Sequence, residues 1–360
     1  MRLSYISKGA KSGNYNMDSK IIKQKIIDFS KSIGIDAIGF IKAEVMIELK
    51  DYLLEHKHNG YDSGWEEDNL DNRINPNLHM KDAKSIIVIA VSYQSRESGT
   101  IKTDPNRGRI AKVSWGQDYH KLLHTKLQLL ENFIVDNIDT SSTNIAFVDT
   151  GPLVDRGIAV KAGIGFYGYN CNVINHQFGS CIFIGSLLTS LDLPPDSVEM
   201  MECMKCNKCI AACPTQAIVA PYKINSKQCL AYLTLTKGEA GNEYQNKLTD
   251  QVYGCDICQQ VCPHNSDVPN HTHNELNEID EVKYPDLIEL LTISNKDFQK
   301  KYGHTSGVWR GKKPWQRNAL LLIGQRKLVG AIPQVTFMSE NDPRKDMRDL
   351  AACILKQLNT

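Results

Sequence analysis

The chain has 360 residues, with 42 Lys+Arg against 41 Asp+Glu, a formal net charge of +1 and 41% hydrophobic residues. This balance argues against a highly basic nucleic-acid-binding protein and against an acidic tail, but it leaves room for a local basic patch. The N-terminus lacks the apolar core of a signal peptide and no run of about 18 apolar residues occurs, so we expect a cytoplasmic protein without membrane spans.

The polar residues 1–16 show no periodicity, and we interpret them as a disordered extension, with Met17 as an alternative start of the protein. Residues 17–198 follow as an α/β unit. Apolar residues at helical spacing predict helices at Ile22–Ile33, Leu123–Ile134 and Leu153–Ala162. Apolar runs predict four strands, at Ala37–Ile41, Ser85–Tyr93, Ile145–Val148 and Ile182–Leu188. The alternation of strands and helices indicates a layered α/β domain.

A cysteine-rich module is predicted at 199–268. The chain has eleven cysteines, and most of them stand in tight groups between Cys203 and Cys262. Clustered cysteines in a chain without a secretion signal favour metal ligation over disulfides. Cys171, Cys181 and Cys353 lie outside the groups and are expected to be ordinary buried thiols.

The first group, Cys203-x2-Cys206-x2-Cys209-x3-Cys213-Pro214, has the spacing of bacterial ferredoxins. The second group ends in the same way but has Val252 in place of its first cysteine, and Cys229 is the available replacement. In this topology the fourth cysteine of a run ligates the other cluster. We therefore predict two [4Fe–4S] clusters in a ferredoxin-like domain, one held by Cys203, Cys206, Cys209 and Cys262, the other by Cys213, Cys229, Cys255 and Cys258. Zinc sites are the alternative, because CxxC pairs also bind zinc, but the repeated Cys-Pro endings favour iron–sulfur clusters.

Three other segments carry candidate chemistry. Gly163-x-Gly165-x-x-Gly168 matches a dinucleotide-binding pattern but follows a predicted helix instead of a strand, so no nicotinamide site is expected. Asp149 follows a predicted strand, where it could act in chemistry or cap the helix near Leu153. Asp118 is expected to cap the next helix, while Tyr119 and His120 beside it are left open.

The segment from Trp309 to Arg317, WRGKKPWQR, combines four cations with two tryptophans. This combination suits phosphate contact and base stacking on RNA, and the alternative is a solvated helix start. Residues 269–360 are predicted to be helical, because Trp315–Ile323 and Asp346–Leu358 carry helical patterns that together resemble one HEAT-type helix pair.

These motifs together resemble the epoxyqueuosine reductase family over residues 80–325, with weaker likeness back to Met17. The matching segments are SWGQDYHKLL, FVDTGPLVDRGIAVKAGIGFYGYN, CMKCNKCIAACPTQAI, QCLAYLTLTKG, YGCDICQQVCPHN and GHTSGVWRGKKPWQRNAL. The resemblance implies an oxidoreductase of queuosine biosynthesis. Its α/β domain and cluster domain would hold a cobalamin between them, the clusters would reduce cobalt to Co(I), and the epoxide oxygen of epoxyqueuosine in a tRNA anticodon loop would be removed.

The resemblance also assigns residues. Asp149 would be the proton donor, and burial against the corrin would raise the pKa of its carboxyl group. The implied cobalamin contacts are Arg73, Ala111, Asp149, Tyr169, Asn170, Val173, Ile184, Ala231, Asp256 and Ile257, and Ala111 stands where some relatives carry Cys. The implied tRNA contacts are Lys237, Arg310, Lys312 and Lys313. An external low-potential electron donor is expected as a further partner, and the chain is expected to be a monomer.

Two rival functions remain open at this point. The first is a corrinoid-dependent reductase of another substrate class, similar to reductive dehalogenases. Those proteins usually carry an export signal and lack the WRGKKP-type segment. The second is a non-catalytic iron–sulfur electron carrier, which would have no affinity for tRNA.

Overall fold

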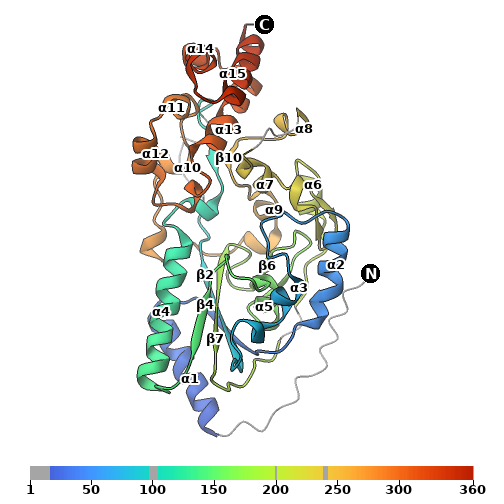
Figure 1. Ribbon diagram of the computed structural model, residues 1–360, viewed down its shortest axis with the longest axis vertical. Helices are drawn as coiled ribbons and strands as arrows, with labels where there is room; N and C mark the ends of the chain where they lie inside the picture. The colour runs from blue at the N-terminus through green and yellow to red at the C-terminus, as the bar shows by residue number, and fades with distance from the viewer. Residues whose placement is uncertain (1–16, 97–103, 199–200, 238–241, 360) are drawn as a thin grey trace.

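The computed structural model describes residues 17–96, 104–198, 201–237 and 242–359, so the predicted extension at 1–16 lies outside the described residues. Three parts follow one another along the long axis (Figure 1): a sheet with helices on both faces, a middle part of cysteine-bearing loops, and a helical C-terminal part. Among the described residues, no helix is long and apolar enough to cross a membrane.

The N-terminal part is built on a four-stranded sheet in which every neighbouring pair of strands is antiparallel. In their order across the sheet, the strands are β1 (Ala37–Lys42), β2 (Ser85–Ser92), β7 (Ile182–Thr189) and β4 (Asn144–Phe147). The four predicted strands are confirmed to within a residue at each end. The rule that places ligands at the carboxyl ends of parallel strands does not apply to Asp149, because this sheet has no parallel pair.

Helices cover both faces of this sheet (Figure 1). One face packs on α1 (Met17–Ser32) and α4 (Tyr119–Asn137), and the other packs on α2 (Lys50–His58), α3 (Leu70–Ile74) and α5 (Asp155–Lys161). The central strand β2 is buried along its whole length, because successive side chains point to opposite faces and both faces are covered. Ile87, Ile89 and Val91 enter the first core, and Ile86, Val88 and Ala90 enter the second.

Two predicted helix starts have different outcomes. Asp118 caps α4, since its side chain accepts a hydrogen bond from the backbone N–H of His120. The alternative that Asp149 caps the following helix is wrong, because α5 begins at Asp155 after Val154. The glycine pattern at 163–168 leaves α5 and enters the hairpin of β5 (Phe166–Tyr167) and β6 (Val173–Ile174). It therefore lacks the strand-to-helix context of a dinucleotide site, as expected.

The middle part consists of loops, short helices and short strands. Its helices are α6 (Lys208–Ala212), α7 (Leu230–Leu235), α8 (Asn242–Gln245) and α9 (Ile257–Gln260), and its hairpin is formed by β8 (Ile218–Ala220) and β9 (Lys223–Ile224). A parallel pair of β3 (Arg109–Ile110) and β10 (Gln251–Tyr253) joins the N-terminal part to this one. The chain thus crosses between the parts at β3 before it returns to complete the sheet.

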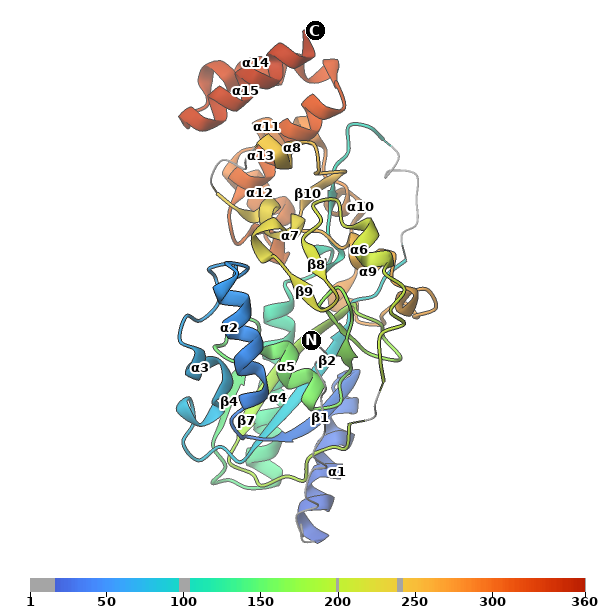
Figure 2. The same ribbon diagram turned by 90° about the vertical axis from the view of Figure 1, so that its right-hand side faces the viewer.

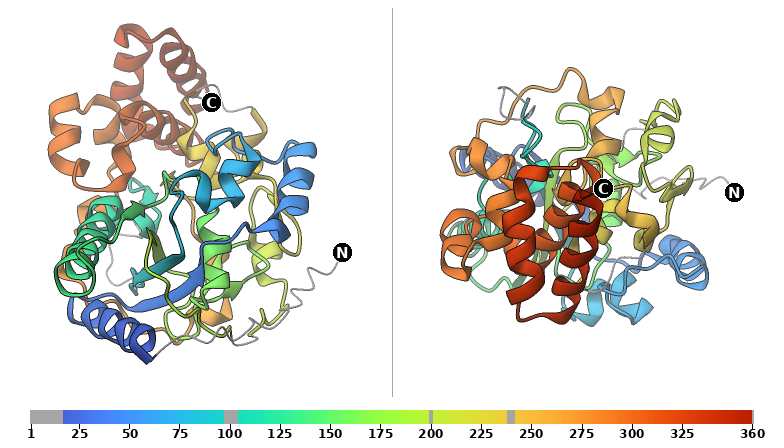
Figure 3. Two further views of the ribbon diagram at one scale, coloured as in Figure 1. Left: turned by 60° about the horizontal axis from the view of Figure 1, so that its bottom comes forward. Right: turned by 90° about the horizontal axis from the view of Figure 1, so that it is seen from above.

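The C-terminal part is helical, as predicted. Its helices are α10 (Asp280–Lys283), α11 (Leu287–Thr292), α12 (Asn295–Tyr302), α13 (Lys312–Gln325), α14 (Ile332–Asn341) and α15 (Lys345–Leu358). The two predicted helices correspond to α13 and α15, and α14 stands between them in the chain and lies beside α15 (Figures 2 and 3). Cys353 on α15 is exposed, so its prediction as a buried thiol is wrong, whereas Cys171 and Cys181 are buried.

Candidate active site

The first cysteine set surrounds a pocket. Lys205 and Asn207, which separate its first three cysteines, have left-handed backbone conformations with φ of 56° and 60°, and these wrap the chain tightly. A small pocket lies inside the turns, and its lining includes Cys203, Cys206, Cys209 and Cys262. These are the four residues predicted to share one cluster, and Cys262 comes from the second run.

The other four cysteines form a second set of electrostatic neighbours. Burial is the main cause that raises the pKa of Cys258, and the charges of Cys255, Cys229 and Cys213 raise it further. Burial also raises the pKa of Cys262, and here the charges of Cys203 and Cys206 raise it further. The thiols therefore influence one another within the two predicted sets. Cys213 of the first run neighbours cysteines of the second run, and Cys262 of the second run neighbours cysteines of the first.

The missing cysteine of the second run has a structural reason. Val252 is fully buried on β10, in the core shared with the C-terminal helices, so its side chain cannot reach a cluster. Within the described ranges, no three His, Cys, Asp or Glu side chains meet closely enough to hold a single metal ion. The Sγ atom of Cys213 accepts a hydrogen bond from the N–H of Ala217 at 3.3 Å, which is the kind of bond that tunes cluster sulfur ligands.

Asp149 stands in a strained turn directly after β4. Its φ is 55°, and the N–H of Thr150 donates to the carbonyl of Val148 at 2.5 Å, so Asp149 is the central residue of a tight three-residue turn. Such left-handed conformations of a residue other than glycine are costly and concentrate at functional sites. The carboxylate is exposed, with 61% of its side-chain surface accessible.

Two neighbouring side chains from the start of α4 hold this carboxylate. The Tyr119 hydroxyl donates to Oδ2 of Asp149 at 2.7 Å, and Nε2 of His120 lies 3.4 Å from the same oxygen. The Nδ1 atom of His120 faces Asp118 at 2.8 Å, so the imidazole lies between two carboxylates. Only the charged imidazolium can donate from both nitrogens, and this arrangement favours it.

These contacts determine the protonation of the group. The hydrogen bond from His120 lowers the pKa of Asp149 although burial opposes this, and Tyr119 adds to the lowering. The hydrogen bond to Asp149 in turn raises the pKa of His120. In the protein alone, two donors outweigh burial at Asp149, and the shifts favour the proton on the imidazole over the carboxylate. The expectation that burial against a corrin raises the pKa of Asp149 stays a prediction.

A second carboxyl group near Asp149 behaves in the opposite way. Burial, aided by the charge of Asp149, raises the pKa of Asp155 to about 7. Its Oδ1 atom is buried and has no hydrogen-bond donor among the described residues. Arg73 on α3 lies near enough for its charge to act on Asp155, and its carbonyl accepts a hydrogen bond from Val154 at 3.3 Å. Arg73 and the segment after Asp149 are thus held together.

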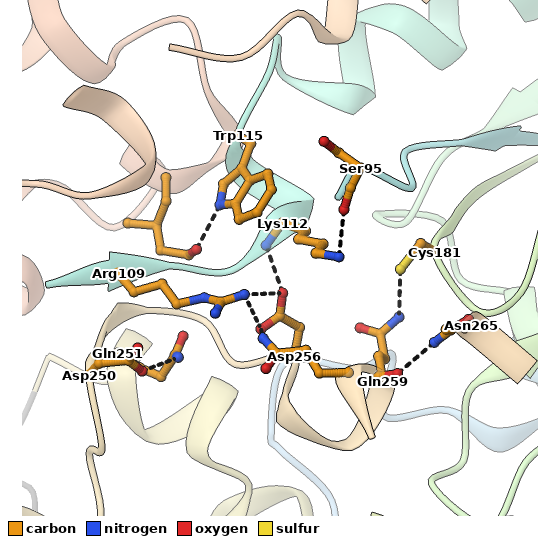
Figure 4. A network of polar contacts seen from close by, with 12 residues as sticks. Ser95, Arg109, Lys112, Trp115, Cys181, Asp250, Gln251, Asp256, Gln259 and Asn265 are labelled. Atoms are coloured by element: carbon orange, nitrogen blue, oxygen red, sulfur yellow. Dashed lines mark hydrogen bonds and ion pairs between the residues drawn. The ribbon is translucent and has the colours of Figure 1, made fainter. Parts of the chain in front are cut away.

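Figure 4 shows the polar network at the junction of the N-terminal and middle parts. Asp256, between Cys255 and Cys258, forms a buried ion pair with Arg109 of β3 at 3.4 Å and accepts a hydrogen bond from the N–H of Lys112 at 3.1 Å. A pocket of about 300 Å³ adjoins this network, and its lining includes Gln94, Lys112, Cys181, Asp256 and Gln259. The pocket therefore takes residues from both parts.

The other predicted cobalamin contacts lie on both sides of the same junction. Tyr169 and Asn170 line the first cluster pocket, and the Asn170 amide donates to the carbonyl of Cys258 at 3.4 Å. Ala111 is buried, and its N–H donates to the carbonyl of Tyr253 at 2.8 Å. The remaining contacts are placed on β6, β7, α7 and the start of α9, namely Val173, Ile184, Ala231 and Ile257.

The four cations of the basic segment are not equally available for contact with RNA phosphates. Lys312 donates to the carbonyl of Ile293 at 2.8 Å, and Lys313 pairs with Asp346. Arg317 is buried and donates to carbonyls of Leu233 and Thr236, so it holds the end of α7 and is no part of a surface patch. Arg310 is half-buried, whereas Lys237 is exposed.

Its two tryptophans also differ. Trp309 is 56% exposed, but Trp315 is fully buried and bonds to the carbonyl of Gly307, so the expectation of two stacking aromatics within this segment is wrong. Helical periodicity could not have separated the two tryptophans, because α13 is buried on all sides from Pro314 to Gly324.

Comparisons with known proteins give a consistent result. A family model described as epoxyqueuosine reductase QueG, DUF1730, matches residues 73–150, and a 4Fe-4S double cluster binding domain matches residues 202–265. The chain is 43% identical over 344 residues to the epoxyqueuosine reductase of Bacillus anthracis, covering 95% of this chain and 90% of that protein. It is 40% identical to that of Staphylococcus aureus, covering 96% and 91%.

Solved structures agree. A crystal structure of epoxyqueuosine reductase with an epoxyqueuosine-modified tRNA-Tyr stem loop superposes with a TM-score of 0.91 at 40% identity, covering 95% of this chain and 91% of that one. The Bacillus subtilis protein with its catalytic aspartate loop swung out of the active site superposes with a TM-score of 0.91 at 39% identity, covering 94% and 91%.

Proposed function

The chain belongs to the epoxyqueuosine reductase family, and from that premise we propose that it reduces epoxyqueuosine in a tRNA anticodon loop at the junction of its N-terminal and middle parts. It is an oxidoreductase of queuosine biosynthesis in tRNA. The observation that carries the proposed site is Asp149, held in a strained, exposed turn by two hydrogen-bond donors. Family membership favours this function over a dehalogenase or an electron carrier.

We propose that the two cysteine sets hold two [4Fe–4S] clusters, with Cys203, Cys206, Cys209 and Cys262 on one and Cys213, Cys229, Cys255 and Cys258 on the other. The pocket lined by the first set, the mutual electrostatic influence within each set and the double-cluster match support this assignment. The four thiolate ligands of a [4Fe–4S] cluster stand around the cluster, so thiols that line one pocket are suitably placed to bind it. An external low-potential donor would supply single electrons to these clusters.

We further propose that a cobalamin binds at the junction, as the family resemblance implies. When bound, it supplies the electron transfer from the clusters that opens the epoxide. The residues present fit such a group, because Oδ1 of Asp155 and Oε1 of Gln94 are buried acceptors without donors among the described residues, and a corrin carries amide donors around its rim. The ten contacts predicted from the sequence would hold it from both sides of the junction.

Asp149 would then deliver the proton that the departing epoxide oxygen requires. The hydrogen bond to Asp149 raises the pKa of His120, so a protonated His120 would pass its proton through Asp149 to that oxygen, which leaves Asp149 ionised and His120 neutral. Tyr119 keeps the carboxylate in place through its 2.7 Å hydrogen bond. Removal of the oxygen takes two electrons and two protons and leaves the carbon–carbon double bond of queuosine and a water molecule.

The tRNA would reach the site along the C-terminal part, which we propose to act as a HEAT-like helical surface in a monomeric enzyme. A relative binds an epoxyqueuosine-modified stem loop. Lys237 and Arg310 remain the best candidates for contacts to it. Lys312 and Lys313 would have to exchange their internal partners for phosphate oxygens.

The test is anaerobic reconstitution with iron, sulfide and cobalamin, followed by reduction in the presence of epoxyqueuosine tRNA and nucleoside analysis. The intact chain should form queuosine, and Asp149→Asn should retain both cofactors while turnover falls at least about 100-fold. Asp136→Asn, at an exposed carboxylate in the last turn of α4, is the control. Near-normal turnover of Asp149→Asn would remove it from the mechanism, and no queuosine from the fully loaded wild-type chain would refute the function.

A further inference from the structure

Two of the four tryptophans are exposed to solvent, and these two lie in contact. Trp65 is 42% exposed and Trp309 is 56% exposed, while Trp115 and Trp315 are buried in the core. The Trp65 and Trp309 rings meet edge to face, with centroids 5.5 Å apart. A contiguous exposed aromatic patch on a protein surface commonly marks an interaction site.

An arginine and a tyrosine complete the patch. The Arg310 guanidinium lies over both indole rings, 5.0 Å from Trp65 and 4.7 Å from Trp309, and its Nε donates to the carbonyl of Leu235. The Tyr232 ring of α7 packs on Trp65 with a centroid distance of 4.6 Å. We call Trp65, Tyr232, Trp309 and Arg310 the aromatic platform. It draws residues from all three parts of the chain, and Figure 2 shows the loop after α2 lying next to α7.

The loop that carries Trp65 is held in its shape before any partner arrives. The Glu66 carboxylate accepts hydrogen bonds from the backbone N–H groups of Ser63, Gly64 and Trp65 and from the Ser63 hydroxyl. Burial acts to raise the pKa of Glu66, but these bonds lower it to about 2. Trp65 therefore presents its ring without a large ordering cost on binding.

The aromatic platform adjoins the candidate active site. The indole N–H of Trp309 donates to the hydroxyl of Tyr253 at 3.1 Å. The N–H of Asp118, at the start of α4, donates to the carbonyl of His304 at 2.7 Å. The segment that leads to Trp309 therefore lies against the start of α4, whose Tyr119 holds Asp149.

We propose that the aromatic platform stacks an unpaired base of the anticodon loop that neighbours the epoxyqueuosine nucleotide. The partner chemistry follows from the residues: single-stranded RNA is recognised by stacking of splayed bases on aromatic rings and on arginine guanidinium planes. The proposal rests on the proposed function, because it names how the same substrate is held. It gives the exposed tryptophans a role that the buried Trp315 cannot have.

The experiment measures the Kd of the reconstituted full-length protein for an epoxyqueuosine-modified anticodon stem loop by fluorescence anisotropy, across a series of salt concentrations. Trp65→Ala and Trp309→Ala should each raise the Kd about 5- to 100-fold, the range expected for one lost base–aromatic stack. The corresponding Phe variants, which keep a ring face, should recover most of the affinity. Ile21→Ala, at an exposed apolar side chain on α1 and outside the C-terminal part, is the control and should change little.

Two further measurements separate stacking from other roles. The slope of log Kd against log salt should be unchanged in the Ala variants, because a stacked base releases no counterions. On a stem loop with an abasic nucleotide next to epoxyqueuosine, the penalty of Trp309→Ala should disappear. Unchanged Kd values in stably folded Ala variants, or a reduced salt slope, would overturn the stacking proposal. Queuosine formation by the wild-type protein would still leave the proposed function intact. Wild-type protein that neither binds nor reduces the stem loop would overturn both.

Discussion

The substitution His120→Gln tests how the proton reaches Asp149. In the wild-type protein, the hydrogen bond with Asp149 raises the pKa of His120. The protonated fraction of His120 therefore falls as pH rises through that value, and a rate that depends on this proton falls with it. A hydrogen bond to a charged group contributes about 1.5–3 kcal/mol, and screening at an exposed carboxylate favours the lower end. At about 1.4 kcal/mol per factor of ten, His120→Gln should slow the reaction roughly tenfold near neutral pH.

The assay is single-turnover queuosine formation by the reduced, fully loaded protein over a range of pH. Wild-type protein should lose rate on the alkaline side of the raised pKa of His120, and His120→Gln should lack this limb. His124→Gln, one helical turn along α4 on an exposed side chain, is the matched control and should retain it. If His120→Gln keeps the wild-type pH profile, the imidazole is no proton source and the reasoning from its two carboxylate contacts fails.

Three further outcomes follow from the structure. Cys229→Ser should reduce the iron content of reconstituted protein from about eight to about four atoms, whereas Cys171→Ser should keep all of it, as iron analysis and absorbance would show. Asp256→Ala should destabilise folding by about 1–3 kcal/mol in denaturant titration, because it removes the buried carboxylate that pairs with Arg109. Asp68→Ala, in an exposed ion pair, should change stability by less than about 0.5 kcal/mol. The pKa of Asp155 is about 7 in the folded protein and roughly 4 in the unfolded chain, so the folded state binds the proton more tightly. The free energy of unfolding without cobalamin should therefore fall as pH rises between these values. Asp155→Asn should abolish that fall, and an unchanged pH dependence in this variant would contradict the argument.

Much of the framework could be predicted from local pattern. The strand at β2 was predictable because an unbroken β-branched run must be covered on both faces, and the two cores that it separates supply that cover. The cysteine spacing also predicted which thiols lie together, since turns at Lys205 and Asn207 bring the first three thiols of one run around one pocket. In both cases the physical cause lies within a few residues of sequence.

The remainder depended on contacts between distant segments. Nothing near Asp149 in the sequence reveals that Tyr119 and His120 hold it, and its pKa is lowered for that reason. Trp65 has no local motif at all, and only the fold brings it to Trp309. The antiparallel order of the sheet was likewise not encoded in the alternation of strands and helices, which a parallel sheet would share.

Two of these three features, the contacts of Asp149 and the aromatic platform, both bear on how a substrate is positioned. A residue other than glycine in a left-handed turn costs of order 1–3 kcal/mol, and the bonds from Tyr119 and His120 to Asp149 offset that cost. A carboxylate held by such a balance can change position when its partners change charge, for instance when His120 gives up its proton. A substrate loop must therefore be fixed by contacts outside this turn. The proposed aromatic platform, with its loop ordered by Glu66, would supply such contacts outside the Asp149 turn.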